Sequence, residues 1–268
     1  MIESFDELVI SRSELIYVLN ALQAKHVVGV DIKEFELTPS GLESLLQKAE
    51  KNLIASNLVT IDPSTQTRQI NPILIGMIGA LAFRSAAFVL VRGVRDKGQQ
   101  LFIFNVYQDI IVEHTQPQQS LHRLAVLEDL DAFFSRIDQL VPLHSVITKD
   151  RPQFVMSQTA FQDIQQNKGL QDYEIAQTLV KAGLSKDLTL PFIQAFQNPI
   201  ITFSLAILSC EQDTAVDASS ATIFADENSA WGVWGGVEGI RETDCLVFPT
   251  GTNDIKVAFA DWLDVEIT

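Results

Sequence analysis

A weak internal repeat, spaced by about 126 residues, most constrains how this chain can fold. Residues 41–61, GLESLLQKAEKNLIASNLVTI, have the pattern of a helix with one apolar face that ends at Asn57 before a short strand. Residues 169–184, GLQDYEIAQTLVKAGL, have the pattern of a second helix that ends at Gly183. When these two helix ends are aligned, the apolar residues on their last turns also coincide. The repeat indicates two copies of one structural unit.

The order of the expected elements repeats along the chain. The first half predicts a helix over 12–22, a helix ending at 57, a turn-rich loop or hairpin over 61–72, a short helix opening at Pro72, strands over 86–94, 101–107, 110–115 and 121–127, and a helix over 128–140. The second half predicts the helix ending at 183, a short helix opening at Pro191, strands over 200–210, 220–226, 230–239 and 244–250, and a helix over 252–266.

This order predicts an α+β fold with a pseudo-twofold internal repeat, in which central antiparallel β-meanders are flanked by helices. We expect an N-terminal half over residues 1–143 and a C-terminal half over residues 144–268, which together form one continuous domain. An edge strand of one meander can pair with the other meander, which would give one sheet with fewer exposed edges.

Composition limits the classes of function. The chain has 268 residues, 47% of them hydrophobic and 20% charged, which is typical of a globular protein with a real core. It has no apolar run long enough for a transmembrane helix, and its N-terminus carries acids where a signal peptide carries basic residues. Cys210 and Cys245 form no metal or redox motif and are expected to be ordinary buried thiols. These features together predict a cytoplasmic protein.

The balance of charge argues against nucleic acid as a partner. The formal net charge is −15, and both halves are acidic, with 12 basic against 17 acidic residues in 1–143 and 7 against 17 in 144–268. Binding to the phosphates of DNA requires a cationic surface. A winged-helix regulator stays an alternative, because the stretch over 41–61 has that appearance. Its basic surface would come from Arg84, Arg92, Arg95 and Lys97.

No motif nominates a catalytic, cofactor-binding or metal-ligating residue. His26, His114, His122 and His144 lack the spacing of zinc ligands, although His114 and His122 can be neighbours across a hairpin. The chain has no GxSxG nucleophile elbow and no GxxxxGK[ST] phosphate loop. The acids near the last turns, Asp226, Glu227, Glu238, Glu242 and Asp244, are expected to be solvated. An enzyme of another type would reveal itself by a deep pocket with perturbed titratable groups.

Two other features are candidate contacts for a partner. Trp231 and Trp234 lie three residues apart in an expected strand, so they should face opposite sides, one in the core and one partly exposed. The expected loops at residues 95–99 and 211–220 are candidates by position, because loops on a rigid sheet often carry function.

Several stretches share the pattern of one known family: the opening helix ELIYVLNAL, LIASNLVTID followed by INPILIGMIGALA, the strand AAFVLVRGV, and FPTGTNDIKVAFADWL in the second half. In these stretches the chain resembles the EspG family, the cytoplasmic chaperones of ESX (type VII) secretion systems. The resemblance implies a quasi-twofold fold and a noncatalytic protein-binding module. The implied partner is a helical, possibly secreted client protein that the chaperone keeps soluble, with no cofactor, nucleic acid or membrane involved.

Overall fold

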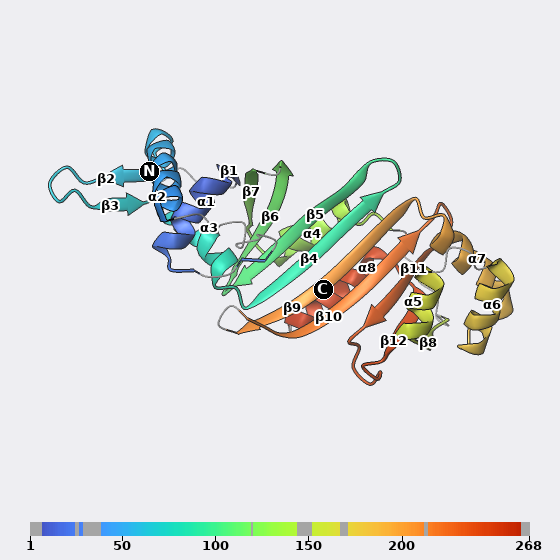
Figure 1. Ribbon diagram of the computed structural model, residues 1–268. Helices are drawn as coiled ribbons and strands as arrows, with labels where there is room; N and C mark the ends of the chain where they lie inside the picture. Colours follow the sequence, from blue (N-terminus) through green and yellow to red (C-terminus); the bar gives the residue numbers. More distant parts are fainter. Residues whose placement is uncertain are drawn as a thin grey trace. The chain divides into compact units, whose positions relative to one another are not determined.

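The computed structural model describes residues 7–24, 27–28, 39–118, 120–143, 152–166, 171–211 and 214–263 (Figure 1). Its first half contains β1 (Glu7–Ser11), α1 (Arg12–Ala21), α2 (Pro39–Ala55), β2 (Val59–Ile61), β3 (Arg68–Ile70), α3 (Pro72–Ala82), β4 (Ala86–Val94), β5 (Gly98–Tyr107), β6 (Ile110–Gln118), β7 (Leu121–Leu127) and α4 (Leu130–Leu140). Its second half contains β8 (Phe154–Ser157), α5 (Gln158–Gln166), α6 (Asp172–Lys181), α7 (Lys186–Gln197), β9 (Ile201–Glu211), β10 (Thr214–Ala225), β11 (Ala230–Gly235), β12 (Asp244–Pro249) and α8 (Thr252–Leu263).

The strand order confirms the predicted fold class. Ten of the described strands form one sheet in the order β1-β7-β6-β5-β4-β9-β10-β11-β12-β8. The first five strands of this order repeat in reverse in the last five, with β1 matching β8 and β4 matching β9. The two meanders join at β4 and β9, where the Arg95 amide donates to the Ile200 carbonyl at 2.9 Å and the Cys210 amide donates to the Ser85 carbonyl at 2.8 Å. The protein is therefore an α+β fold with a pseudo-twofold repeat.

The two aligned helix ends have the same hydrogen bonds. After α2, Asn57 adopts a φ of 58°, and the Leu58 amide donates to the Leu53 carbonyl at 2.8 Å. After α6, Gly183 adopts a φ of 109°, and the Leu184 amide donates to the Leu179 carbonyl at 3.0 Å. Both ends are Schellman caps, which satisfy the last carbonyls of a helix through a left-handed residue. The repeat that is visible in the sequence is thus a repeat of helix-capping geometry.

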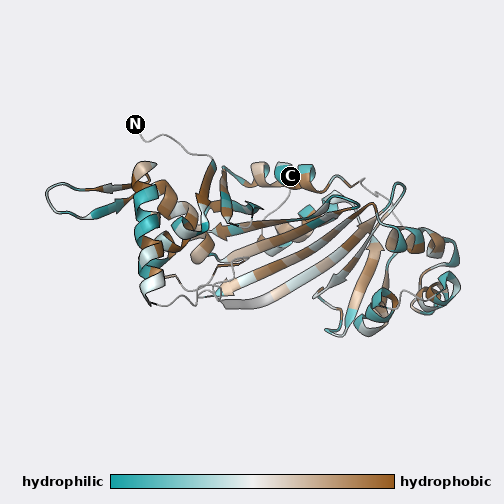
Figure 2. Cartoon of the chain, turned by 45° about the horizontal axis from the view of Figure 1, so that its top comes forward, coloured by the Kyte–Doolittle hydropathy of each residue, from teal (hydrophilic) through white to brown (hydrophobic). Residues whose placement is uncertain are grey.

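The chain divides into two compact units, and four long strands contribute to both. Unit 1 comprises residues 1–88, 102–133 and 208–217, and unit 2 comprises residues 89–101, 134–207 and 218–268. In unit 1, helices α1, α2 and α3 bury their apolar residues against β6 and β7. In unit 2, α5, α6 and α7 bury theirs against β8, β10, β11 and β12. Figure 2 shows that the β2–β3 hairpin of unit 1 is mostly hydrophilic.

The structure adds three elements that the periodicity did not predict, namely β1, β8 and α5. Each is short. Edge strands β1 and β8 contain only five and four residues, too few for alternation to stand out.

One helix start was predicted wrongly. Helix α7 begins at Lys186 rather than at Pro191, which lies inside the helix. Proline cannot donate to the carbonyl four residues earlier, which belongs to Asp187. Since Asp187 is exposed, water can satisfy that carbonyl and the helix continues.

No helix in the described ranges combines the length and the apolar character that crossing a membrane requires.

Two glycines should respond in opposite ways to replacement by alanine. A Cβ at Gly232 in β11 would lie 2.3 Å from Thr250 Oγ1 and 2.4 Å from Trp234 Nε1, whereas a Cβ at Gly79 in α3 would meet nothing within 4 Å. We expect Gly232→Ala to lower the free energy of unfolding by about 1–3 kcal/mol through overpacking. Gly79→Ala should raise it by about 0.5–1 kcal/mol, since alanine has less backbone freedom to lose. Urea denaturation measures both effects, and a shift of the same sign in the two variants would contradict this packing.

Candidate functional site

The candidate site is a half-open cavity in unit 2 with a volume of about 560 Å³. Helices α5, α6 and α7 and strands β9 and β10 supply its walls. The lining residues are Phe161, Ile164, Gln165, Ile175, Phe196, Gln197, Pro199, Thr202, Thr222 and Phe224. Aromatic, aliphatic and proline side chains make up six of these ten residues, and uncharged amides and hydroxyls make up the other four. A volume of this size lies in the range of ligand-binding pockets.

A cluster of aromatic rings holds the inner wall of the cavity in place. Phe196 lies 6.1 Å from Phe161 and 5.2 Å from Phe224, measured between ring centroids. Behind it, Phe192 is fully buried and packs edge-on against Phe224 and Trp231, at 5.2 and 5.3 Å. Rings packed in this way leave little rotamer freedom. The aromatic part of the lining is therefore held in a fixed arrangement, while polar groups make up about half of the exposed lining.

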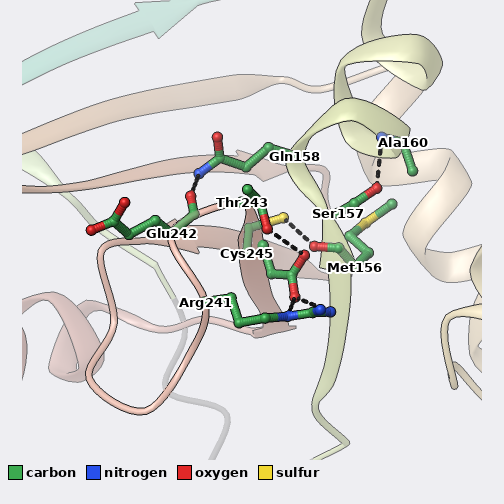
Figure 3. Close-up of polar contacts among 9 residues, drawn as sticks. Met156, Ser157, Gln158, Ala160, Arg241, Glu242, Thr243 and Cys245 are labelled. Carbon is green, nitrogen blue, oxygen red and sulfur yellow. Dashed lines mark hydrogen bonds and ion pairs between the residues drawn. The ribbon is translucent and has the colours of Figure 1, made fainter.

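Helix α5, which carries two of the apolar lining residues, is anchored at its first turn (Figure 3). The Gln158 side-chain amide donates to the Glu242 carbonyl at 2.9 Å, and the Gln158 backbone amide donates to the Thr243 carbonyl at 2.9 Å. The Ser157 hydroxyl caps the helix by accepting from the Ala160 amide at 3.1 Å. These bonds fix α5 to the segment that precedes β12.

The same segment holds a buried carboxylate. Asp244 accepts from Arg241 Nε and Nη2, both at 2.8 Å, and the Thr243 hydroxyl lies 3.4 Å from its other oxygen. Asp244 is only 6% exposed, so this acid from the predicted cluster is not solvated. Glu227, Glu238 and Glu242 are exposed as expected. Asp226 closes a turn by accepting from the Asn228 and Ser229 amides, each at 2.7 Å.

None of the residues that line the cavity is ionisable, so its lining offers apolar groups, amides and hydroxyls. Burial of an apolar group against the aromatic walls would drive binding. The side-chain amides of Gln165 and Gln197, at the exposed rim of the cavity, can hydrogen-bond to a bound molecule and orient it. The Gln197 amide already donates to Asp172 Oδ1 at 3.1 Å.

Among the predicted histidines, His114 and His122 are neighbours on β6 and β7, as expected. His114 Nε2 lies 2.9 Å from His122 Nδ1, the rings stack with centroids 5.1 Å apart, and each side chain is 1% exposed. Burial, and secondly the nearby His122, lower the pKa of His114 from 6.5 to about 3. Burial, and secondly the positive charge of Arg12, lower the pKa of His122 from 6.5 to about 4. Both rings are therefore neutral in the folded protein near neutral pH.

Metal binding finds no support around this pair. No cluster of three or more histidine, cysteine or acidic side chains that could hold an ion occurs within the described ranges. His26 and His144 lie outside the described residues.

The four basic residues of the winged-helix alternative do not form a free cationic face. Arg84 is 5% exposed, and its guanidinium donates to the Leu81 carbonyl at 2.6 Å. Arg95 donates to the carbonyls of Asn198 and Pro199. Arg95 and Lys97 are exposed and Arg92 is partly exposed, so three adjacent cations are left, without the fourth that the alternative requires.

Two predictions about partner contacts need correction. Trp231 and Trp234 do face different surroundings, but both are buried, at 2% and 7% exposure. Trp234 stacks on Phe248 with ring centroids 5.8 Å apart, which covers the ring that was expected to be partly exposed. The expected loop over residues 211–220 is largely strand, because β9 ends at Glu211 and β10 begins at Thr214.

Both cysteines are free and buried, and they should be unreactive in the folded protein. The Cys245 thiol donates to the Met156 carbonyl at 3.3 Å (Figure 3). Burial, and secondly the charge of Asp244, raise the pKa of Cys245 to about 11. Because the thiolate is the reactive form, we expect Ellman's reagent at pH 8 to modify neither cysteine without denaturant and both in 6 M guanidinium chloride. Rapid modification of native protein would contradict this burial.

Comparisons with known proteins bear on the fold. No protein-family model matches the chain, and no curated protein matches its sequence. Among solved structures, the chain is similar to the type VII secretion system chaperone EspG5 of Mycobacterium tuberculosis, determined in complex with the PE25–PPE41 dimer. The match has a TM-score of 0.65 and 12% sequence identity, and covers 97% of this chain and 97% of that chain. The chain therefore has an EspG-like fold along nearly its whole length.

Proposed function

We propose that this protein is a noncatalytic chaperone that binds a helical client protein through the cavity of unit 2. The observation that carries the proposal is the preformed cavity of about 560 Å³, which has aromatic walls and no ionisable lining residue. Such a surface suits the apolar face of an amphipathic helix, whose side chains dock into a groove. Burial of one large apolar side chain contributes about 2–3 kcal/mol to such binding.

The EspG-like fold supports the same function. EspG5 was determined bound to a protein dimer, and the present chain shares its fold over 97% of its length. We therefore extend protein binding and a link to type VII secretion to this chain, and place its action in the cytoplasm. The client is expected to be a helical protein of the kind that such a system secretes.

Site-specific photocrosslinking in the native host tests the proposal. A benzoyl-phenylalanine replaces Gln165 at the rim of the cavity or, as a control, Gln69 on the exposed β3 strand. We expect one protein to be crosslinked from position 165 and not from position 69. Thr222→Trp, which fills the cavity, should abolish that crosslink. The purified partner should be helical by circular dichroism and should bind the wild-type chain in calorimetry.

Two results would overturn the proposal. One is a crosslinking pattern that does not differ between the two positions. The other is a crosslink from position 165 that survives Thr222→Trp in a variant with wild-type thermal stability.

A further inference from the structure

The segment over residues 198–200 borders the cavity and also contacts Arg95 in the turn between β4 and β5. Pro199 lines the cavity, and its carbonyl accepts from Arg95 Nε at 3.2 Å and from Arg95 Nη2 at 3.0 Å. Arg95 Nη2 also donates to the Asn198 carbonyl, and the Arg95 amide donates to Ile200 at 2.9 Å. The Arg95 guanidinium is thereby held against the carbonyl of a residue that lines the cavity, although Arg95 comes from a different part of the chain.

A second contact links β4 to the cavity. A Cβ at Gly93 would lie 2.6 Å from the hydroxyl oxygen of Thr202, and Thr202 lines the cavity. The next nearest atom, Cγ of Gln99, is 3.8 Å away. The Cβ of any other residue at position 93 would clash with the Thr202 hydroxyl. Glycine therefore lets the β4 backbone approach the cavity closely.

The β4–β5 segment that contacts Pro199 is more basic than the whole chain. Residues 89–101 contain Arg92, Arg95 and Lys97 against a single acid, Asp96, which gives 3 − 1 = +2 in a chain of net charge −15. The lining residues carry no charge themselves, and an acid, Asp172, accepts from the lining residue Gln197 at 3.1 Å. Arg95 and Lys97 are exposed. Arg95 Nη1 makes no hydrogen bond to any described residue, so it can donate to an outside acceptor.

From this juxtaposition we infer that the cavity and Arg95 form one composite site for a client helix that presents a large apolar side chain beside an Asp or Glu carboxylate. The inference rests on the proposed function, because the apolar side chain occupies the same cavity. The aromatic walls take the apolar group, and Arg95 Nη1 donates a charge-assisted hydrogen bond to the carboxylate. Charge complementarity identifies the partner: the exposed guanidinium of Arg95, bonded to the lining residue Pro199, selects an anion at that place.

Two dyes that differ in one charged group test the composite site on the full chain. 1-Anilinonaphthalene-8-sulfonate carries an anion on the naphthylamine body, and N-phenyl-1-naphthylamine lacks it. At 50 mM NaCl we expect Arg95→Gln to weaken the binding of the sulfonate dye about fivefold and that of the neutral dye less than twofold. The sulfonate effect should shrink at 500 mM NaCl, because salt screens an exposed pair.

Three further variants make the result specific. Arg95→Lys keeps the positive charge but removes the guanidinium that donates to the carbonyls of Asn198 and Pro199. This variant should retain the preference for the sulfonate dye. Lys51→Gln removes an exposed charge from α2 and should change neither affinity. Thr222→Trp fills the cavity and should weaken both dyes at least tenfold. Equal losses of both dyes in Arg95→Gln together with no preference in Arg95→Lys would overturn the charge selection.

The client supplies the decisive comparison. In the partner identified by crosslinking, replacement of the acid nearest the docked apolar residue by its amide should weaken binding about fivefold in wild type and not further in Arg95→Gln. If Thr222→Trp abolishes client binding while Arg95→Gln and the amide replacement change nothing, the composite site is wrong and the proposed function stands. If Thr222→Trp leaves client binding intact, the proposed function itself fails.

Discussion

Acidification from pH 7.5 to pH 5.0 is expected to lower the free energy of unfolding by roughly 4 kcal/mol through His114 and His122 alone. Their pKa values in the folded protein, about 3 and about 4, lie below the ordinary value of 6.5. At pH values between the folded-state pKa and 6.5, the unfolded chain binds more protons than the folded chain. The free energy of unfolding therefore falls as the pH decreases through this range. At pH 5.0 each histidine lowers the free energy of unfolding by about 2 kcal/mol. This value follows because pH 5.0 lies 1.5 pH units below the pKa of 6.5 in the unfolded chain.

Urea denaturation followed by tryptophan fluorescence at the two pH values measures this loss. The double variant His114→Gln/His122→Gln replaces both rings by neutral amides, which can still hydrogen-bond to each other. We expect this variant to lose at least half of the pH dependence, and either single variant to lose an intermediate part. A pH dependence that is identical in wild type and in the double variant would show that the buried pair does not control acid stability.

Phe192→Ala is expected to destabilise the protein by about 3–5 kcal/mol, the usual cost of deleting a fully buried aromatic ring. Phe192 has no solvent exposure and packs against Phe154, Phe196, Phe224 and Trp231, with centroid distances between 5.2 and 6.4 Å. Removal of the ring leaves a hole that rigid neighbours cannot close. It also frees Phe196, so the inner wall of the cavity should loosen.

Leu190→Ala is the matched control, because Leu190 lies two residues away on the same helix and is 56% exposed. We expect it to change the free energy of unfolding by less than about 0.5 kcal/mol. Both variants are compared by urea denaturation at pH 7.5. If Phe192→Ala cost as little as the control, the aromatic cluster would not be the centre of this core.

Much of the fold could be predicted because it depends on local patterns. Alternation and helical periodicity among residues close in the sequence predicted the strands of both meanders and helices α4 and α8. The caps at Asn57 and Gly183 stood out because left-handed backbone strongly favours glycine and asparagine. The EspG resemblance stated from the same patterns agrees with the fold of EspG5.

The candidate site was largely missed, because its residues come from five elements that no spacing connects. Helix α5 contributes Phe161 and Ile164, but with nine residues it was too short to be recognised from its pattern. An apolar pair three residues apart in QTAFQDIQQ was the only available signal. The turn at residues 95–99 was proposed by position alone, and only the bonds of Arg95 to Asn198 and Pro199 explain why it is relevant.

The sequence by itself determined the α+β class, the repeat and the strand-rich meanders, since these follow from side-chain periodicity and capping between near neighbours. Only the tertiary structure decided that Trp234 is buried, that His114 and His122 stack out of water, and that Arg95 bonds to a residue that lines a cavity. The physical reason is that burial and electrostatic environment depend on residues distant in the chain. Arg95 is more than 100 residues from Pro199, and no local pattern records that contact.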